Sequence, residues 1–368
     1  MPQDPPRARP SAPARTCSGT PSPARASLPE HPGLAPYAAR SSAASRPVAE
    51  EARGSGLRNP YREDLHRIVH TRAFRRLAHK TQAIGAASCD HCRTRLTHTL
   101  EVAQIARTLA RALALNEDLA EAAAMGHDLG HAPFGHAGEK ALDSVVPGGF
   151  RHQAQSLRIV DLLAWGGKGL NLTDDVRDAI LKHSKGLGPV FARGRERPAT
   201  FEGQAVRVAD IIAYLAHDMD DAIEAGLLKI SDIPVSILAA FGESPESRED
   251  AMVNDLLDST RVLADGPRFA FSPSMEESME SLRSFMLEKV YRCPEIASEM
   301  AAGAETVRAI YGAVTTDASL FEEIPLKHLS RTREEAAKDF IAGMTDRFAI
   351  KFLERVRSGE RPVMPVKF

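Results

Sequence analysis

Hydrophobic residues recur at helical spacing from about residue 62 onward, and patterns typical of strands are nearly absent. In the first part of this region, Asn116 is expected to cap a helix that ends near Gly126. His127 and Asp128 then fall at the C-terminal edge of that helix. The pattern here predicts helices over residues 65–77, 96–113 and 116–126.

The same periodicity continues to the end of the chain. Pro147-Gly148-Gly149 interrupts it, and Thr173, followed by two acidic residues, is expected to cap a later helix. No internal repeat is present. The fold class is therefore predicted to be all-α, a helical bundle with additional C-terminal helices. The further predicted helices cover residues 157–163, 173–183, 206–225, 247–265, 275–291, 295–313 and 331–357.

The first 47 residues differ from the rest, since they hold 11 of the 24 prolines and only two acidic residues, Asp4 and Glu30. Such a segment buries too little apolar surface to offset its ordering entropy, so residues 1–33 are predicted to be a disordered leader. It also resembles an organellar transit peptide, although its prolines oppose the amphipathic helix of such peptides. A solvated tail or a misplaced start codon is the simpler explanation. We expect a core over residues 34–230 and a helical region packed on it over 231–368.

Composition narrows the function only slightly. The 368 residues carry a formal net charge of −2, so no global charge points to nucleic acid or to an anionic membrane. No apolar run approaches the length of a membrane span. The four cysteines, Cys17, Cys89, Cys92 and Cys293, are too few and too scattered for a secreted disulfide framework. The cytoplasm is the expected location.

The most informative stretch is His127-Asp128-Leu129-Gly130-His131. With His98 upstream and Asp210 downstream, it offers two imidazoles and two carboxylates, a ligand set suited to Mn, Fe, Zn, Ni or Mg. On a regular helix, neighbouring side chains diverge by about 100°, so His127 and Asp128 reach one ion most easily where the helix ends. Gly126 and Gly130 bracket them, as a bend would require. The set lacks thiolate, which argues against a purely structural zinc.

Each of these residues also has an ordinary structural interpretation. A single histidine on an apolar helix face is usually a core residue, and a single aspartate at a helix end is usually a cap. Capping alone explains poorly why several ionisable groups gather beside Pro133-Phe134-Gly135. These groups, all within ten residues, are His127, Asp128, His131 and His136. The cluster by itself leaves the metal interpretation and the structural one open.

Several longer motifs, in order, resemble the HD-domain phosphohydrolases, and specifically the deoxyguanosinetriphosphate triphosphohydrolase-like proteins. The resemblance covers roughly residues 34–350. Its upstream and downstream ends are Arg72–Gln82 and Asp339–Ala349. Between them lie Arg93-Thr-Arg-Leu-Thr-His98, His127-Asp-Leu-Gly-His-Ala-Pro-Phe-Gly-His-Ala-Gly-Glu139, Phe150-Arg-His152, Ile180-Leu-Lys-His183 and Glu202-Gly-Gln-Ala-Val-Arg-Val-Ala-Asp210.

The resemblance implies hydrolysis of a deoxynucleoside triphosphate at the α-phosphorus, giving deoxynucleoside and inorganic triphosphate. It implies a divalent metal ion (Mn, Mg or another first-row metal) bound by His98, His127, Asp128 and Asp210. It also implies that His136, Glu139 and His152 carry out acid–base catalysis. His136 and Glu139 are about one helical turn apart. His131 would contact phosphate or support the metal ligands.

The resemblance also suggests how the substrate is held. Arg95 would bind the triphosphate, which carries about four negative charges. Tyr214 and Asp218 lie four and eight residues beyond Asp210 on one helix face, where they would meet the deoxyribose and its 3′-hydroxyl. Gln82 would also contact the sugar. The protein is expected to form a homo-oligomer and to make no membrane contact. Whether a single-stranded nucleic acid acts as an effector is left open.

Two positions depart from the family pattern. Ile211 follows the metal aspartate where some members of the wider family carry a basic residue. Either one phosphate contact is weaker, or another cation such as Lys185 or Arg207 substitutes. Cys89-Asp-His-Cys92 lacks the second pair of a zinc knuckle, so two free thiols are expected, with a redox-sensitive lid as the alternative. Two other functions stay open: a related phosphohydrolase of a monophosphate, alarmone or cyclic dinucleotide, and a non-catalytic nucleotide-binding or single-strand-binding regulator.

Overall fold

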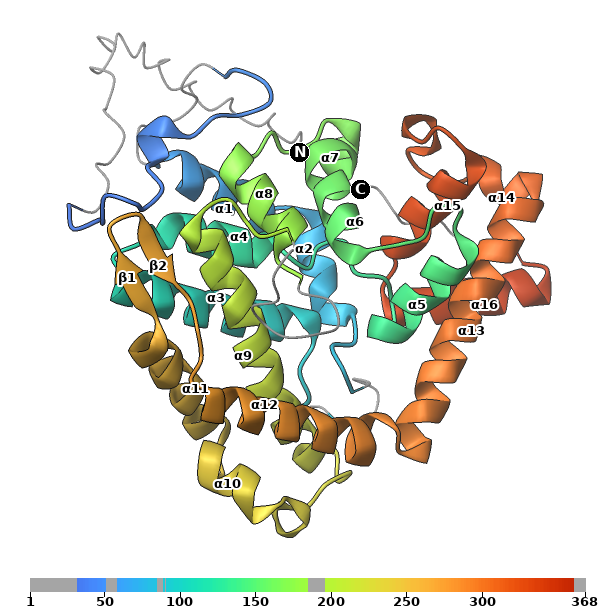
Figure 1. Ribbon diagram of the computed structural model, residues 1–368. Helices are drawn as coiled ribbons and strands as arrows, with labels where there is room; N and C mark the ends of the chain where they lie inside the picture. Colours follow the sequence, from blue (N-terminus) through green and yellow to red (C-terminus); the bar gives the residue numbers. More distant parts are fainter. Residues whose placement is uncertain (1–31, 51–57, 85–88, 90, 185–195, 361–368) are drawn as a thin grey trace, which may run out of the picture.

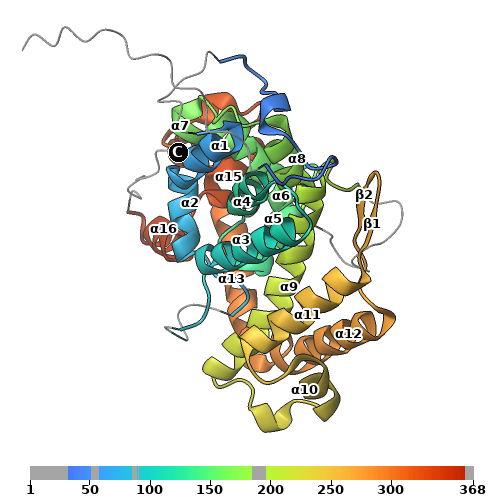
Figure 2. The ribbon, with the colours of Figure 1, turned by 90° about the vertical axis from the view of Figure 1, so that its left-hand side faces the viewer.

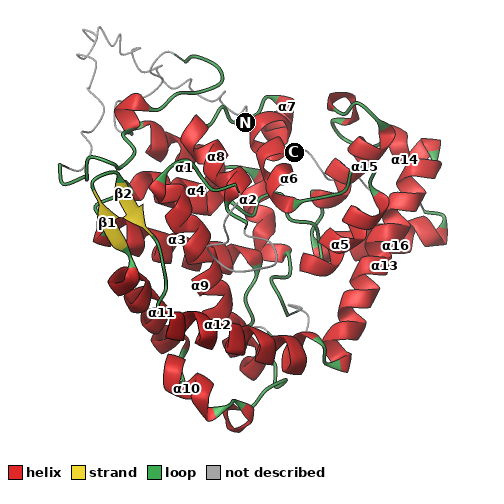
Figure 3. Cartoon of the chain, in the orientation of Figure 1, coloured by secondary structure: helices red, strands yellow, loops and turns green. Residues whose placement is uncertain are grey.

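The computed structural model describes residues 32–50, 58–84, 89, 91–184 and 196–360 (Figure 1). In this part of the chain nearly all regular structure is helical (Figure 3), which confirms the predicted all-α class. The predicted leader, residues 1–33, lies outside the described residues except for its last two. Among the described helices, none is both long and apolar enough to cross a membrane.

The first half of the chain builds the part that carries the predicted ligands. Asn116 caps α4 as expected, because its side chain accepts hydrogen bonds from the backbone N–H groups of Asp118 and Leu119. The helices are α1 (Pro60–Val69), α2 (Arg72–Arg76), α3 (Arg95–Ala112), α4 (Glu117–Gly126), α5 (Gly135–Val145), α6 (His152–Arg158), α7 (Ala164–Gly167), α8 (Asp174–Lys182) and α9 (Phe201–Glu224). Short 3₁₀ turns cover Ser41–Ala43 and Leu77–His79, and a π-helical turn covers Ile159–Leu163.

The second half adds α10 (Val235–Phe241), α11 (Pro245–Ser259), α12 (Pro273–Met286), α13 (Pro294–Thr316), α14 (Ala318–Glu322), α15 (Arg333–Ala342) and α16 (Asp346–Ser358). Short turns cover Ile230–Asp232, Leu287–Tyr291 and Lys327–Leu329. Two strands, β1 (Arg261–Leu263) and β2 (Gly266–Arg268), form an antiparallel hairpin. Figures 1 and 2 show α10, α11 and α12 gathered at one end of the molecule, with α9 running from them into the centre.

Three predicted helices are interrupted. The helix predicted over 65–77 breaks at His70 and Thr71, because the Thr71 side chain accepts from Phe74 N and starts α2. The helix predicted over 331–357 is two helices, because Thr345 accepts from Phe348 N and starts α16. We call residues 339–346, which contain this turn, the elbow. The predicted 247–265 helix stops at Ser259, where the hairpin begins.

Two local details also differ from expectation. Thr173 stands at the N-cap position of α8, but its hydroxyl donates to Asp64 of α1 at 2.7 Å instead of capping its own helix. In the hairpin, Gly266 has φ +121, a conformation that side chains disfavour, and an added Cβ would lie 2.2 Å from the Phe201 ring. The hairpin is therefore held against the start of α9.

Three apolar clusters surround the predicted ligands. The first packs α3, α4 and α9 against α10, α11 and α12. The second joins α5 to α13, α15 and α16, and the third joins α1, α2, α6 and α8 to α4. The polar side chains described next lie where α3, α4, α8 and α9 meet, so rigid helices on all sides hold them in place.

Candidate metal centre

His127 and Asp128 lie where α4 ends, as predicted. His127 is the C-cap residue, and its Nδ1 donates to the Ala124 carbonyl at 2.5 Å. Its Nε2 is buried and has no hydrogen-bond partner among the described residues. Gly126 and Gly130 serve close packing here, not left-handed backbone, since an added Cβ would lie 2.6 Å from Ile180 and 2.2 Å from Ser156 N.

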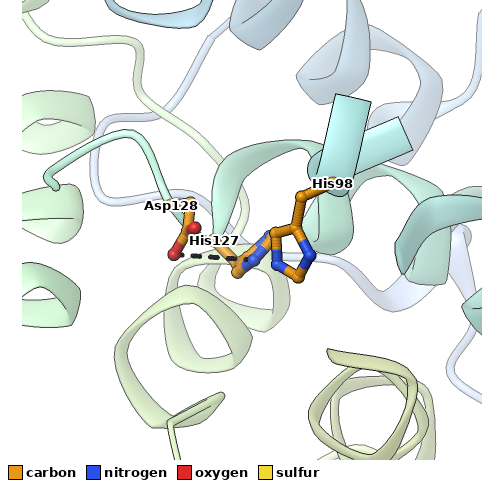
Figure 4. A group of neighbouring side chains, drawn as sticks. All are labelled: His98, His127 and Asp128. Atoms are coloured by element: carbon orange, nitrogen blue, oxygen red, sulfur yellow. Dashed lines mark ion pairs between the residues drawn. The ribbon is translucent and has the colours of Figure 1, made fainter. Parts of the chain in front are cut away.

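Four candidate ligands converge at this point. His98 comes from α3 and Asp210 from α9, and His98 Nε2 lies 3.1 Å from Asp210 Oδ1. His127 Nε2 lies 3.5 Å from Asp128 Oδ1 and 3.9 Å from Asp210 Oδ1. The ligand atoms of His98, His127 and Asp128 all lie within 4.8 Å of one another (Figure 4). Three of the four predicted ligands thus form one close group, and Asp210 joins it beside His98 and His127.

The chemistry of these atoms suits a divalent cation. Because His127 Nδ1 carries the proton that caps α4, its unpartnered Nε2 presents a lone pair. Burial raises the pKa of Asp128, but His127, His131 and Arg95 lower it well below its ordinary value. Burial likewise raises the pKa of Asp210, and its contacts with His98 and His127 lower it below its ordinary value. Both carboxylates are therefore ionised and available as ligands.

A second group of imidazoles faces Asp128 from the other side. His131 and His152 stack with centroids 4.1 Å apart, and their Nε2 atoms lie 3.6 and 4.0 Å from Asp128 Oδ1. His183, at the end of α8, donates from Nδ1 to the Ile180 carbonyl at 2.8 Å. Its Nε2 therefore accepts from His152 Nε2, 3.1 Å away.

Two hydrogen-bond partners surround the His152 ring. Its Nδ1 lies 2.9 Å from Glu139 Oε1, so both ring nitrogens face acceptors. Burial lowers the pKa of His152, but the hydrogen bond to Glu139 raises it more, to above its ordinary value. Burial, with His127 and His152 nearby, lowers the pKa of His183 to about 3. Hydrogen bonds thus hold His152 between the Glu139 carboxylate and the neutral imidazole of His183.

His136 and Glu139, the predicted acid–base pair, lie 3.8 Å apart, and the His136 side chain is 59% exposed. The shorter contacts of Glu139 go to His152, since its Oε1 also accepts from the His152 backbone N–H at 3.0 Å. Glu139 therefore lies between the two histidines, with the buried His152 as its hydrogen-bonded partner.

Arg95 and Gln82 border the ligand set. Arg95 is buried, and its Nη1 donates to Asp128 Oδ2 at 2.7 Å, so it orients the candidate ligand directly. Gln82 is also buried, and its Oε1 has no hydrogen-bond partner within the described ranges. Arg95 Nη2 reaches the Gln82 carbonyl at 3.4 Å. Both predicted substrate contacts therefore lie beside the metal ligands.

Tyr214 and Asp218 follow Asp210 along α9. Asp218 is buried, and Tyr291 from the second half of the chain donates to its Oδ2 at 2.5 Å. The Tyr214 and Tyr291 rings are nearly parallel, with centroids 6.4 Å apart. Asp218 Oδ1 has no hydrogen-bond partner in the described part of the chain. It lies 2.8 Å from His217 Nδ1 without an aligned hydrogen bond, so it keeps capacity to accept from a hydroxyl beside the two aromatic rings.

Comparison with known proteins gives the family. Residues 95–228 match the family model described as HD domain, and residues 269–355 match that described as phosphohydrolase-associated domain. A deoxyguanosinetriphosphate triphosphohydrolase-like protein from Caldanaerobacter subterraneus is 45% identical, over 87% of this chain and 91% of its own length. One from Desulfatibacillum aliphaticivorans is 41% identical, over 88% and 94%. The chain belongs to this family.

This triphosphohydrolase-like chain is accordingly an HD-domain phosphohydrolase, and its His and Asp clusters can bind a metal. Among solved structures, a hypothetical protein from Aquifex aeolicus aligns with a TM-score of 0.47 and 18% identity, over 78% of this chain and 66% of that chain. That likeness is too distant to bear on function.

The two departures from the family pattern can now be placed. Ile211 is buried in the core of the phosphohydrolase. Arg207 donates to the Glu196 carbonyl at 3.0 Å and lines a cavity beside the hairpin, while Lys185 lies outside the described residues. Cys89 and Cys92 are both free thiols, as expected from their sequence context.

Three residues beside the site were not assigned a role from sequence: His183, His217 and Tyr291. For His183 a signal existed. The helix predicted over residues 173–183 ends at His183, just as the helix predicted over residues 116–126 ends directly before His127. Both histidines donate Nδ1 to a carbonyl three residues back. His217 and Tyr291 carried no comparable signal, since their contacts join segments far apart in the chain.

Proposed function

We propose that this phosphohydrolase cleaves deoxynucleoside triphosphates to deoxynucleoside and inorganic triphosphate. The observation that carries the proposal is the arrangement along one face of α9. Asp210 lies beside the other candidate metal ligands, and Tyr214 and Asp218 follow it one and two turns later. Asp218 Oδ1 makes no aligned hydrogen bond and would accept from a sugar hydroxyl. The names of the curated relatives support the same substrate class.

His98, His127, Asp128 and Asp210 would hold the cation. When bound, it would polarise a phosphate oxygen and acidify a water molecule. Two imidazoles with two carboxylates favour Mn²⁺ or a similar first-row ion over Mg²⁺, which prefers oxygen ligands. Calorimetric titration should therefore give tighter binding of Mn²⁺ than of Mg²⁺.

The surrounding residues would handle protons and charge. In the reaction the bond between the α-phosphorus and the 5′-oxygen breaks, water oxygen joins phosphorus, and a proton reaches the 5′-oxygen. His152, whose pKa is raised by its hydrogen bond to Glu139 at 2.9 Å, would supply that proton. His136 is exposed and reaches the same carboxylate, so it is the second candidate acid. Arg95 keeps Asp128 in place and contributes positive charge for the triphosphate.

The product decides this proposal. Purified protein would be incubated with each dNTP and Mn²⁺, and the phosphorus products followed by ³¹P NMR. Intact tripolyphosphate together with free deoxynucleoside is expected, and a chelator should abolish both. Pyrophosphate, orthophosphate or an unchanged substrate would each refute it. Cleavage of a monophosphate, alarmone or cyclic dinucleotide in the same assay would instead identify the related phosphohydrolase.

The expected homo-oligomer and the single-stranded nucleic acid effector remain predictions. Light scattering after size-exclusion chromatography would give the number of subunits. Addition of a short single strand to the tripolyphosphate assay would show whether it changes the rate. Monomeric protein, or a rate that the strand leaves unchanged, would contradict the respective expectation.

A further inference from the structure

His217 lies between the metal ligands and the sugar-side residues of α9. Its Nε2 lies 2.8 Å from Nδ1 of His98, and its Nδ1 lies 2.8 Å from Oδ1 of Asp218. Both His217 and Asp218 are about 1% exposed. We propose that His217 is a positioning residue that fixes the ring of His98 and links it to Asp218, so that one carboxylate serves the sugar and the metal ligand together.

The direction of the proton in each contact follows from the ligand set. His98 Nε2 faces Asp210 and would bind the cation, so the proton of this ring lies on Nδ1 and is donated to His217 Nε2. His217 must then carry its own proton on Nδ1, beside the Asp218 carboxylate. The opposite tautomer would place a lone pair 2.8 Å from a carboxylate oxygen, which is repulsive.

Asp218 is itself anchored from the second half of the chain. Tyr291 donates to its Oδ2 at 2.5 Å, which leaves Oδ1 as the oxygen that faces His217. The 2.8 Å contact is not aligned as a hydrogen bond, so Oδ1 keeps capacity for another donor. A second carboxylate, Glu101, lies 4.0 Å from His217 Nε2 and is the more distant charge. One chain of contacts thus runs from Tyr291 through Asp218 and His217 to His98, a candidate metal ligand.

This inference rests on the proposed function, because it takes the Asp218 side as the sugar side. Its test is Mn²⁺ affinity measured without nucleotide, by electron paramagnetic resonance of the free ion. His217→Leu removes the acceptor for His98 and is expected to weaken Mn²⁺ binding by about 10–100-fold. His217→Gln keeps a carbonyl oxygen that can accept the same proton, so it should restore most of the affinity. A folded His217→Leu protein with wild-type Mn²⁺ affinity would overturn the proposal.

Asp218→Asn tests the link between Asp218 and His217. Because it keeps the side-chain volume, this variant still provides a test if His217→Leu fails to fold. This variant is expected to weaken Mn²⁺ binding because His217 loses the carboxylate that favours its Nδ1–H tautomer. The loss should be smaller than in His217→Leu, because the His217 ring is still present. Tyr214→Phe is the matched control on the same helix face, and Mn²⁺ affinity should not change. Wild-type Mn²⁺ affinity in Asp218→Asn would confine Asp218 to the sugar and refute the link. Absence of tripolyphosphate from the wild-type enzyme would refute the proposed function alone, since these titrations contain no nucleotide.

Discussion

The candidate metal centre and the elbow, residues 339–346, both bury polar groups, but they satisfy them differently. At the metal centre, buried atoms such as His127 Nε2, His131 Nδ1 and Gln82 Oε1 have no hydrogen-bond partner in the described residues. At the elbow, Asp346 accepts from Thr81 N, Thr81 Oγ1 and Phe134 N at 2.9, 2.6 and 2.9 Å. The three unpartnered atoms beside the candidate ligands leave hydrogen-bonding capacity for a bound group, whereas Asp346 is satisfied within the chain.

The elbow supports the loops that border the metal centre. Phe134 has a left-handed backbone, with φ 61, and packs against Gly303 of α13, where an added Cβ would lie 2.8 Å away. Lys80 donates to the carbonyls of His131 and Ala342, the latter at 2.7 Å, and so joins the same loop to α15. The candidate metal centre therefore presents the ligand atoms, and the elbow holds the loops around them in place.

The largest expected effect concerns the metal centre. Asp128→Ala removes one anionic ligand and should abolish metal retention and lower dNTP turnover at least about 1000-fold. It also leaves Arg95 buried without its carboxylate, which costs about 3–5 kcal/mol of folding free energy. Metal content of the desalted, folded fraction and turnover would be measured together.

Asp258→Ala is the matched control for that experiment. Asp258 is exposed at the end of α11, so its removal should change neither metal content nor turnover. Full activity in folded Asp128→Ala would contradict the ligand assignment.

At the elbow, Asp346→Ala removes three hydrogen bonds to a carboxylate, and we expect a loss of about 2–4 kcal/mol in the free energy of unfolding. Turnover should fall because Thr81 and Phe134 lose their anchor. Mn²⁺ affinity should stay within about threefold of wild type, since the ligands come from α3, α4 and α9. Urea unfolding and Mn²⁺ titration would check both. A large loss of Mn²⁺ affinity would show that the elbow also shapes the ligand set.

The difference between these regions also explains what could be predicted from sequence. The candidate ligands could be proposed from sequence because each is a residue type with a chemical signature in an ordered motif; they are His98, His127, Asp128 and Asp210. The two helices on either side of the elbow were predicted as one, because no proline or glycine pair marks the turn and the hydrophobic period continues across it. No role was predicted for His217 or Tyr291, because their contacts join distant segments of the chain, which hydrophobic periodicity does not encode.

Lys80 should give the elbow a pH dependence. Burial, with the charge of Arg76, lowers the pKa of Lys80 to about 7, while the unfolded chain holds this proton up to about pH 10.4. Between these values the unfolded state binds more protons, so the free energy of unfolding rises with pH. A rise of about 2 kcal/mol between pH 7 and 9 is expected from this group.

Urea unfolding at several pH values would measure that rise. Lys80→Met should be less stable, because two buried carbonyls lose their donor, and its stability should no longer climb over this range. The exposed Lys140→Met variant should keep the wild-type slope. An unchanged slope in Lys80→Met would mean that Lys80 remains charged when folded.

The smallest effect is expected at the far end of the elbow. Asp339 accepts from Gln155 Nε2 at 2.9 Å and from Arg158 Nε at 2.8 Å, and so fixes the helix that begins with His152. Asp339→Asn keeps the volume but weakens the pair with Arg158, at a cost of about 1–2 kcal/mol in the free energy of unfolding. Because His152 is also held by Glu139 and His183, neither Mn²⁺ affinity nor the product should change. If turnover fell in this variant while stability did not, α6 would be a moving part of the active site and not a fixed support.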